Sequence, residues 1–144
     1  MGPRREAREL ALQALYQLDV ASGDDPARDL TLFWSHFDAA PDVQAFAREL
    51  VDGVREHHER IDALLADSVE HWRLSRLSRV DLNLLRLATY ELLDRRDIPA
   101  SVAIDEAIEI ARRFGSEDSA AFVNGVLDHV AGVLGVKAKP GRAE

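Results

Sequence analysis

The sequence predicts an all-α fold, a single compact domain of helices packed around one central helix. Apolar residues recur at three- and four-residue spacing along most of the chain, and no segment shows the period-two alternation of a half-buried strand. Segment 78–93 is apolar around most of its circumference, so we expect neighbouring helices on several of its sides. Ser78 and Asp81 resemble a capping box at its start, and Pro99 stops it because the residue before a proline avoids the α region.

Start and stop signals divide the first half of the chain into helices. Pro3 suits a first helical turn, and residues 22–24 (SGD) end that helix. Asp25-Pro26 is typical of a cap followed by a first turn, and predicts a second helix that reaches about residue 36.

A third helix is predicted to start at residues 40–42 (APD). Its apolar spacing continues as far as Trp72, which is long for one helix, so we predict a break between residues 57 and 60.

Two more helices are predicted after the central one. The first runs from about Pro99 to Phe114, and Gly115 is expected to end it in the left-handed conformation. The second begins at residues 116–118 (SED), where acids suit the helix dipole, and its apolar stripe ends at Leu134. We assign residues 1–137 to the domain and residues 138–144 to a polar disordered tail.

The composition restricts the function classes. A net charge of −8 argues against nucleic-acid binding by the whole surface, but is compatible with a local basic patch. The absence of cysteine excludes a disulfide framework, a thiolate nucleophile and a cysteine-based zinc site. No apolar run could cross a bilayer, and the N-terminus lacks the apolar segment of a secretory signal. We therefore expect a cytoplasmic protein without membrane association.

No residue pattern indicates a catalytic or metal centre. The five histidines contain no metal-binding helical motif, and His57 and His58 point in different directions on a helix. Glu106 and Glu109 lie on the polar side of a helix, where a solvated face is the simpler interpretation because acid–base catalysis needs a desolvating cleft. No phosphate-binding loop or nucleophile elbow is present. We expect a protein that is not an enzyme and has no cofactor and no metal.

The clearest functional signal lies in the first predicted helix. Arg4, Arg5 and Arg8 are suited to bidentate phosphate contacts. Gln13 could read a base edge, and an exposed Tyr16 could stack on a single-stranded base. At about 100° per residue, Arg5 and Tyr16 lie roughly 20° apart around the helix axis. The alternative is a solvated terminal helix with a half-buried tyrosine, and the spacing does not decide between the two interpretations.

The last predicted helix contains two unusual residues. Phe122 stands at the edge of the apolar stripe, where it is either a core residue or an exposed stacking platform. Gly125 lies inside the helix, where glycine costs about 1 kcal/mol relative to alanine. A close-packed helix crossing is the favoured explanation for this glycine, and the close approach of a ligand is the alternative.

Short motifs in a fixed order and spacing run through nearly the whole chain. They are Arg8-Glu9, residues 13–16 (QALY), Val80-Asp81, Leu85-Arg86, residues 90–92 (YEL), 97–99 (DIP), 102–107 (VAIDEA), 114–115 (FG) and 118–128 (DSAAFVNGVLD). The set resembles the NusB family of bacterial transcription antitermination factors. The C-terminal motifs are the most specific ones, whereas the middle third is only a compatible helical pattern.

The resemblance implies two three-helix subdomains, at about residues 3–72 and 75–135, with the central helix in the second. It implies a non-enzymatic factor that binds the boxA element of ribosomal RNA leader transcripts together with the ribosomal protein NusE. Such a factor acts within the RNA polymerase antitermination complex and supports processive transcription of ribosomal RNA operons. Relatives are monomers or homodimers, and either state is compatible with the sequence.

The resemblance also implies two sets of surface residues. The RNA-binding set comprises Arg4, Arg5, Arg8, Gln13, Tyr16, Asp118, Ser119, Phe122 and Asn124. The partner-binding set comprises Arg76, Arg79, Asp81 and Arg86.

The chain departs from the family pattern at two positions in this region. Ala121 stands where relatives can carry a basic residue, and Asp105 replaces a frequent asparagine. Ala121 removes one possible phosphate contact, and the N-terminal basic run is also short and interrupted by Glu6. A protein-binding helical adaptor without RNA binding is therefore the alternative function.

Overall fold

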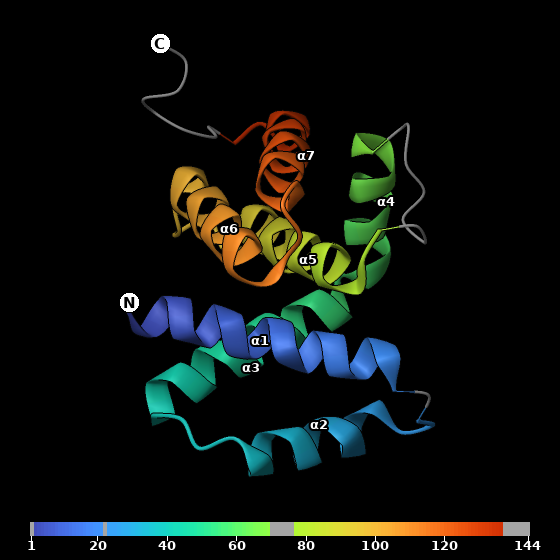
Figure 1. Cartoon of the computed structure of the whole chain (residues 1–144), viewed down its shortest axis with the longest axis vertical. Coiled ribbons are helices and arrows are strands. Elements are labelled where there is room, and N and C mark those ends of the chain that lie inside the picture. The colour runs from blue at the N-terminus through green and yellow to red at the C-terminus, as the bar shows by residue number, and fades with distance from the viewer. Residues whose placement is uncertain (1, 22, 70–76, 137–144) are drawn as a thin grey trace.

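The computed structural model describes residues 2–21, 23–69 and 77–136, and within these residues it contains helices and no strand (Figure 1). The helices are α1 (Pro3–Val20), α2 (Pro26–His36), α3 (Pro41–Glu56), α4 (His58–Ser68), α5 (Arg79–Asp94), α6 (Ala100–Phe114) and α7 (Ser119–Leu134). The predicted fold class is confirmed. None of these helices is long and apolar enough to cross a bilayer.

Two groups of helices meet at α5. Helices α1, α2 and α3 form one layer, and α4, α6 and α7 surround α5 on its other sides (Figure 1). The predicted central helix is confirmed, since eleven of its sixteen residues are buried. Leu84, Leu85 and Leu87 are almost fully enclosed. Helix α5, which is apolar around most of its circumference, is therefore covered by α1 and α3 on one side and by α4, α6 and α7 on the others.

Helix α4 does not lie where the sequence placed it. The predicted break is present at His57, between the end of α3 and the start of α4. After this break, α4 packs against α5 and α7 rather than continuing along α1 and α3. The second group therefore contains four helices instead of three, and residues 58–68 belong with it. Trp72 lies outside the described residues.

The predicted helix starts have physical caps. The Asp25 side chain accepts a hydrogen bond from the backbone N–H of Arg28, at 3.1 Å, in the first turn of α2. The Ser78 hydroxyl accepts one from the Asp81 N–H, also at 3.1 Å, at the start of α5. Each of these contacts satisfies a donor that has no partner within the helix.

The prediction for Gly115 was wrong. Its φ of −91° and ψ of −172° are extended rather than left-handed. Glycine is needed there for space: a Cβ would lie 2.5 Å from Oγ of Ser119 and 2.8 Å from the carbonyl oxygen of Ala111. Among the described residues, the glycine in the left-handed conformation is Gly135, at the end of α7, with φ of 72°.

Close packing is also not the reason for Gly125, because a Cβ at this exposed position would have no neighbouring atom within 4 Å. A close helix crossing occurs instead at Gly53 of α3, where a Cβ would overlap the ring of Tyr90 from α5. Gly53 therefore sets how closely the first layer approaches the central helix.

This contrast gives a matched pair of variants. Gly53→Ala should force the Tyr90 ring out of place and destabilise the fold by about 1–3 kcal/mol, the usual cost of overpacking. Gly125→Ala should stabilise the protein by about 1 kcal/mol, because it adds helix propensity without a clash. Urea denaturation followed by circular dichroism measures both changes. Equal stability of the two variants would contradict the packing assigned to Gly53.

Candidate nucleic-acid interface

Arg5 in the first turns of α1 is joined to α6. Its Nε and Nη2 atoms donate to the two carboxylate oxygens of Glu106, at 2.6 and 2.7 Å. Both side chains are about one-fifth exposed, so this pair lies at the surface. The hydrogen bonds from Arg5 lower the pKa of the Glu106 carboxyl, and the same contact raises the pKa of Arg5. One bidentate face of the guanidinium is thus used within the protein.

Arg8 has a different position from the one expected of a phosphate-binding residue. Only 3 % of it is exposed, and its Nε and Nη2 atoms donate to the Glu91 carboxylate of α5, at 2.9 and 2.7 Å. Glu91 is itself buried, at 2 % exposure. The structure therefore gives Arg8 a place in the core, as the link between the first layer and the central helix. Its contact with RNA stays a prediction.

Three arginine side chains lie close to the aromatic ring of Phe46. The Arg4 guanidinium lies 4.3 Å from the centre of the ring, and those of Arg8 and Arg95 lie at 5.7 and 5.4 Å. Cations over a ring face are held by its negative quadrupole. Arg4 and Arg5 also border one shallow hollow with the Asp97–Pro99 loop and Glu106.

The Arg8–Glu91 pair can be tested by removing one partner. Glu91→Gln should destabilise the protein by about 3–5 kcal/mol, because it leaves the Arg8 charge buried and unpaired. The double variant Arg8→Met/Glu91→Leu should recover most of this loss. Glu9→Gln, which breaks the exposed pair with Arg113, should cost no more than about 1 kcal/mol. Thermal and urea denaturation decide; a Glu91→Gln protein as stable as the wild type would contradict the assigned burial.

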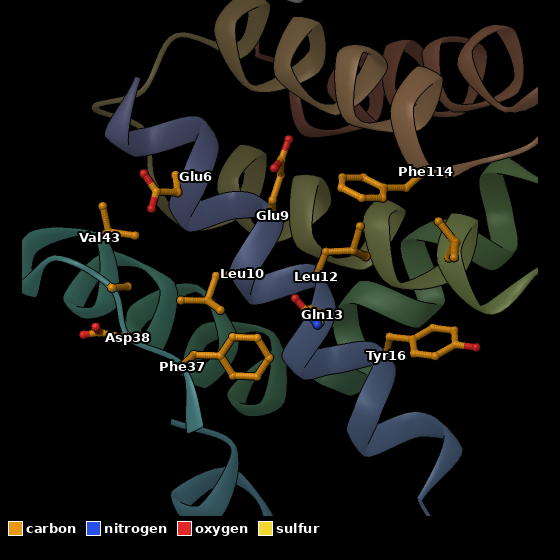
Figure 2. A pocket seen from close by; sticks show the side chains of 12 residues that line it. Glu6, Glu9, Leu10, Leu12, Gln13, Tyr16, Phe37, Asp38, Val43 and Phe114 are labelled. Atoms are coloured by element: carbon orange, nitrogen blue, oxygen red, sulfur yellow. The ribbon is translucent and has the colours of Figure 1, made fainter. Parts of the chain in front are cut away.

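Gln13 and Tyr16 lie in a separate groove along α1, with a volume of about 480 Å³ (Figure 2). The groove is bounded by α1, the α2–α3 loop, the start of α3, the first turn of α5 and the end of α6. Figure 2 shows Phe114 reaching down from α6 toward Leu12, with the Tyr16 ring pointing outward beyond Gln13. Phe114 and Tyr16 are 46 % and 41 % exposed.

The charges around this groove are negative. Glu6, Glu9 and Asp38 stand on its rim, while its floor and walls are mostly apolar. Figure 2 shows Glu6 and Glu9 on the N-terminal half of α1 and Asp38 on the opposing loop. An apolar centre with an acidic rim fits a basic protein surface better than an unshielded phosphate backbone.

Of the four predicted RNA-binding residues at the start of α7, some are buried and others are accessible. Ser119 is 1 % exposed and bonded inside the protein. Asp118 is exposed at the N-cap position, and its side chain makes no capping hydrogen bond. Phe122 is partly buried against the core. Asn124 borders a hollow with the acidic side of α6, and in the described chain its Oδ1 atom has no hydrogen-bond partner.

Helix α6 lies between the two parts of the predicted RNA surface. Its Glu106 borders the Arg4–Arg5 hollow, whereas Asp105, Glu109 and Arg112 border the Asn124 hollow. Arg112 pairs with Glu109, and Arg113 pairs with Glu9 at 3.2 Å. The predicted residues therefore flank a strip of paired charges instead of forming one continuous basic patch.

Three of the four residues predicted to bind a protein partner lie in the first turns of α5. Arg79 is exposed and pairs with Asp19 at 3.1 Å. Arg86 donates twice to Asp62 of α4, at 2.9 Å each, and is mostly covered. Asp81 accepts a hydrogen bond from the Ser119 hydroxyl at 3.1 Å. Arg76 lies outside the described residues.

Three residues that shape these surfaces were not predicted from the sequence. Glu91 was hidden in an apolar run, where a single carboxylate in a buried helix could have signalled a buried cation partner. Glu106 was assigned to a solvated face and instead holds Arg5. Phe114 was predicted as the last residue of a helix, whereas its exposed ring forms one wall of the groove.

The Glu106 carboxyl should contribute to the pH dependence of stability. Its folded-state pKa lies below the ordinary value of 4.5, so its contribution is complete above that pH and is lost as the pH falls through the lowered value. Between about pH 5 and pH 3, urea midpoints should therefore fall more steeply for the wild type than for Glu106→Gln. Glu117→Gln, at an exposed turn, is the control and should follow the wild type. Parallel curves for all three proteins would contradict this role.

Comparisons with known proteins identify the chain's relatives. The NusB family profile matches residues 5–132. A transcription antitermination protein NusB from Myxococcus xanthus is 50 % identical over 138 residues, which cover 93 % of this chain and 98 % of the relative. The NusB protein of Geobacter sulfurreducens is 50 % identical over 135 residues, covering 93 % and 97 %.

Solved structures give the same result for the fold. A structure of T. maritima NusB is 43 % identical, covers 92 % of each chain and superposes with a TM-score of 0.82. A chain in a crystal structure of the antitermination factors NusB and NusE in complex with double-stranded RNA is 26 % identical and has a TM-score of 0.79. That match covers 92 % of this chain and 98 % of the other.

The fold and these matches define a helical protein of the transcription antitermination class. The chain belongs to the NusB family.

Proposed function

We propose that this protein binds boxA-type RNA of ribosomal RNA leader transcripts together with ribosomal protein NusE. It thereby supports processive transcription of ribosomal RNA operons as part of the RNA polymerase antitermination complex, in the cytoplasm, and acts by binding rather than catalysis. The observation that carries the proposal is the family match over residues 5–132, joined to a structural neighbour that was crystallised with NusE and RNA.

The proposed RNA surface begins at the first turns of α1 and continues across α6 to the start of α7. Arg4 and Arg5 face the same hollow and supply positive charge to phosphates. Asp118 and Asn124 offer polar groups to base edges, and Phe122 presents the exposed part of its ring. We assign positioning roles to the buried Arg8 and Ser119, which hold α1 and α7 in place.

The middle of α1 lies between the proposed RNA surface and the proposed partner surface. Gln13 and Tyr16 stay in the proposed RNA-binding set, because the exposed tyrosine ring points outward from the groove and would stack on a base. The same groove reaches Val80, next to Asp81 and Arg79 of the proposed partner surface. NusE bound there would meet an apolar centre and an acidic rim, and Arg86 would support α5 through Asp62. Arg76 completes the proposed set.

The adaptor alternative has an observation in its favour. Arg5, Arg8, Arg112 and Arg113 each pair with a carboxylate, in a chain whose net charge is −8. RNA must therefore compete with internal carboxylates for these cations. Binding by this protein alone should accordingly be weak, and the partner's own basic surface should strengthen it.

The deciding experiment is a titration of a boxA-like RNA and a scrambled RNA of equal length and composition. Each is measured with and without NusE at two salt concentrations. The proposal expects tighter binding of the boxA-like RNA, with the largest preference when NusE is present. Equal affinity for the two RNAs, alongside intact NusE binding, would leave the adaptor function.

Two variants test the proposed surface. Glu106→Gln should release Arg5 and tighten RNA binding several-fold, since one charge-assisted phosphate contact becomes available. Tyr16→Ala should weaken binding by about 1–3 kcal/mol if the ring stacks on a base. A Tyr16→Ala defect that is seen only with NusE present would assign the ring to the partner groove instead. Glu59→Gln, at an exposed position in the first turn of α4, is the matched control for the loss of one acidic group and should leave RNA binding unchanged.

A further inference from the structure

The start of α7 is hydrogen-bonded to the start of α5 through one buried hydroxyl. Oγ of Ser119 accepts a hydrogen bond from the Ser116 N–H at 2.9 Å and donates one to Oδ2 of Asp81 at 3.1 Å. Ser119 is 1 % exposed, so water does not compete for this contact. Asp81 is fixed in turn, because its own N–H donates to the Ser78 hydroxyl.

The turn between α6 and α7 is shaped around the same hydroxyl. A Cβ at Gly115 would lie 2.5 Å from the Ser119 Oγ and 2.6 Å from the Ser119 Cβ. The Ser116 hydroxyl also lies 3.2 Å from the Ser119 Oγ. The position of Ser119 therefore determines where the turn ends and α7 begins.

The Asp81 carboxylate has capacity for another contact. In the described chain its Oδ1 atom is covered and accepts no hydrogen bond, so the carboxylate is held by Ser119 through Oδ2 alone. A carboxylate can accept several hydrogen bonds, and one that is only partly satisfied responds strongly to a nearby cation or donor. Exposed Arg79 and the groove residue Val80 precede Asp81 in the same turn, which places the carboxylate beside the proposed partner surface.

We propose that the Ser119–Asp81 hydrogen bond couples partner binding at the start of α5 to RNA binding at the start of α7. A partner group that donates a hydrogen bond to the partly exposed Asp81 side chain changes the hydrogen bond between Asp81 and Ser119. Ser119 then shifts the start of α7, which carries Asp118 and Phe122. Ser119 is then a positioning residue: it transmits the effect of the partner without touching RNA. This inference rests on the proposed function, because it assigns a route between its two binding faces.

The test measures coupling rather than affinity. The coupling factor is the RNA Kd without NusE divided by the Kd with saturating NusE, and such factors usually lie at about 5–150. Ser119→Ala and Gly115→Ala each disturb the contact from a different side, and each should lower the factor about fivefold or more. Ser68→Ala is the matched control: its hydroxyl donates to the Leu64 carbonyl one turn earlier in α4, and its factor should equal that of the wild type.

A double-mutant cycle identifies the route. Asp81→Ala should reduce the coupling factor in the wild-type background and have little further effect on it in Ser119→Ala, because both changes remove the same bond. Fully additive effects would overturn the proposal, as would a wild-type coupling factor in Ser119→Ala.

Amide hydrogen exchange of the free protein tests the same contact without RNA or NusE. In the free protein, Asp81→Ala should speed amide hydrogen exchange at residues 119–122, whereas the Ser68→Ala control should not. Unchanged exchange would overturn the proposed route. A wild type that binds no RNA would contradict the proposed function, whereas a wild type with strong coupling that Ser119→Ala preserves would contradict this inference alone.

Discussion

The buried ion pair between Arg8 and Glu91 is the constraint on which the arrangement of the two layers depends. Apolar contacts between α1 and α5 would tolerate small slides of one helix along the other, because burial has no direction. A bidentate ion pair at 2.7–2.9 Å tolerates far less, since a shift leaves two charges without partners in a dry interior. The pair therefore fixes the register of α1 more than it adds to net stability. Arg5 and Tyr16 take their positions from that register.

Arginine pairing also changes how the proposed RNA surface should be understood. Arg5 already has an internal counter-ion in Glu106, and Arg113 has one in Glu9. A phosphate that binds Arg5 must displace the Glu106 carboxylate, so its net gain is smaller than that of an unpaired arginine, although the counterions of the RNA are released in both cases. An acidic protein with such a surface gains selectivity against arbitrary nucleic acid, because binding pays only where further contacts accompany the exchange.

The helices could be predicted because their signals are local. The signals act within one or two turns, and the structure places a helix start beside each of them: Pro3, Asp25-Pro26, Ser78 and Pro99. The placement of α4 and the burial of Arg8 depend on residues far away in the sequence, which periodicity does not register. Gly115 was assigned the wrong role for a related reason: glycine serves either conformation or space, and only the nearby Ser119 side chain shows that space is the need. The titrations described above decide whether the predicted residues contact RNA.

The separation along the chain between partners of α1 has a consequence for synthesis on the ribosome. Arg8 meets a carboxylate 83 positions later, and Arg5 meets one 101 positions later. The first helix to emerge therefore carries unneutralised arginines until α5 and α6 have followed it, while α5, α6 and α7 find most of their contacts among close neighbours. Docking of the first layer onto α5 and α6 must therefore wait for residues 79–114, so a product truncated or stalled before them exposes the arginines of α1 without their carboxylate partners.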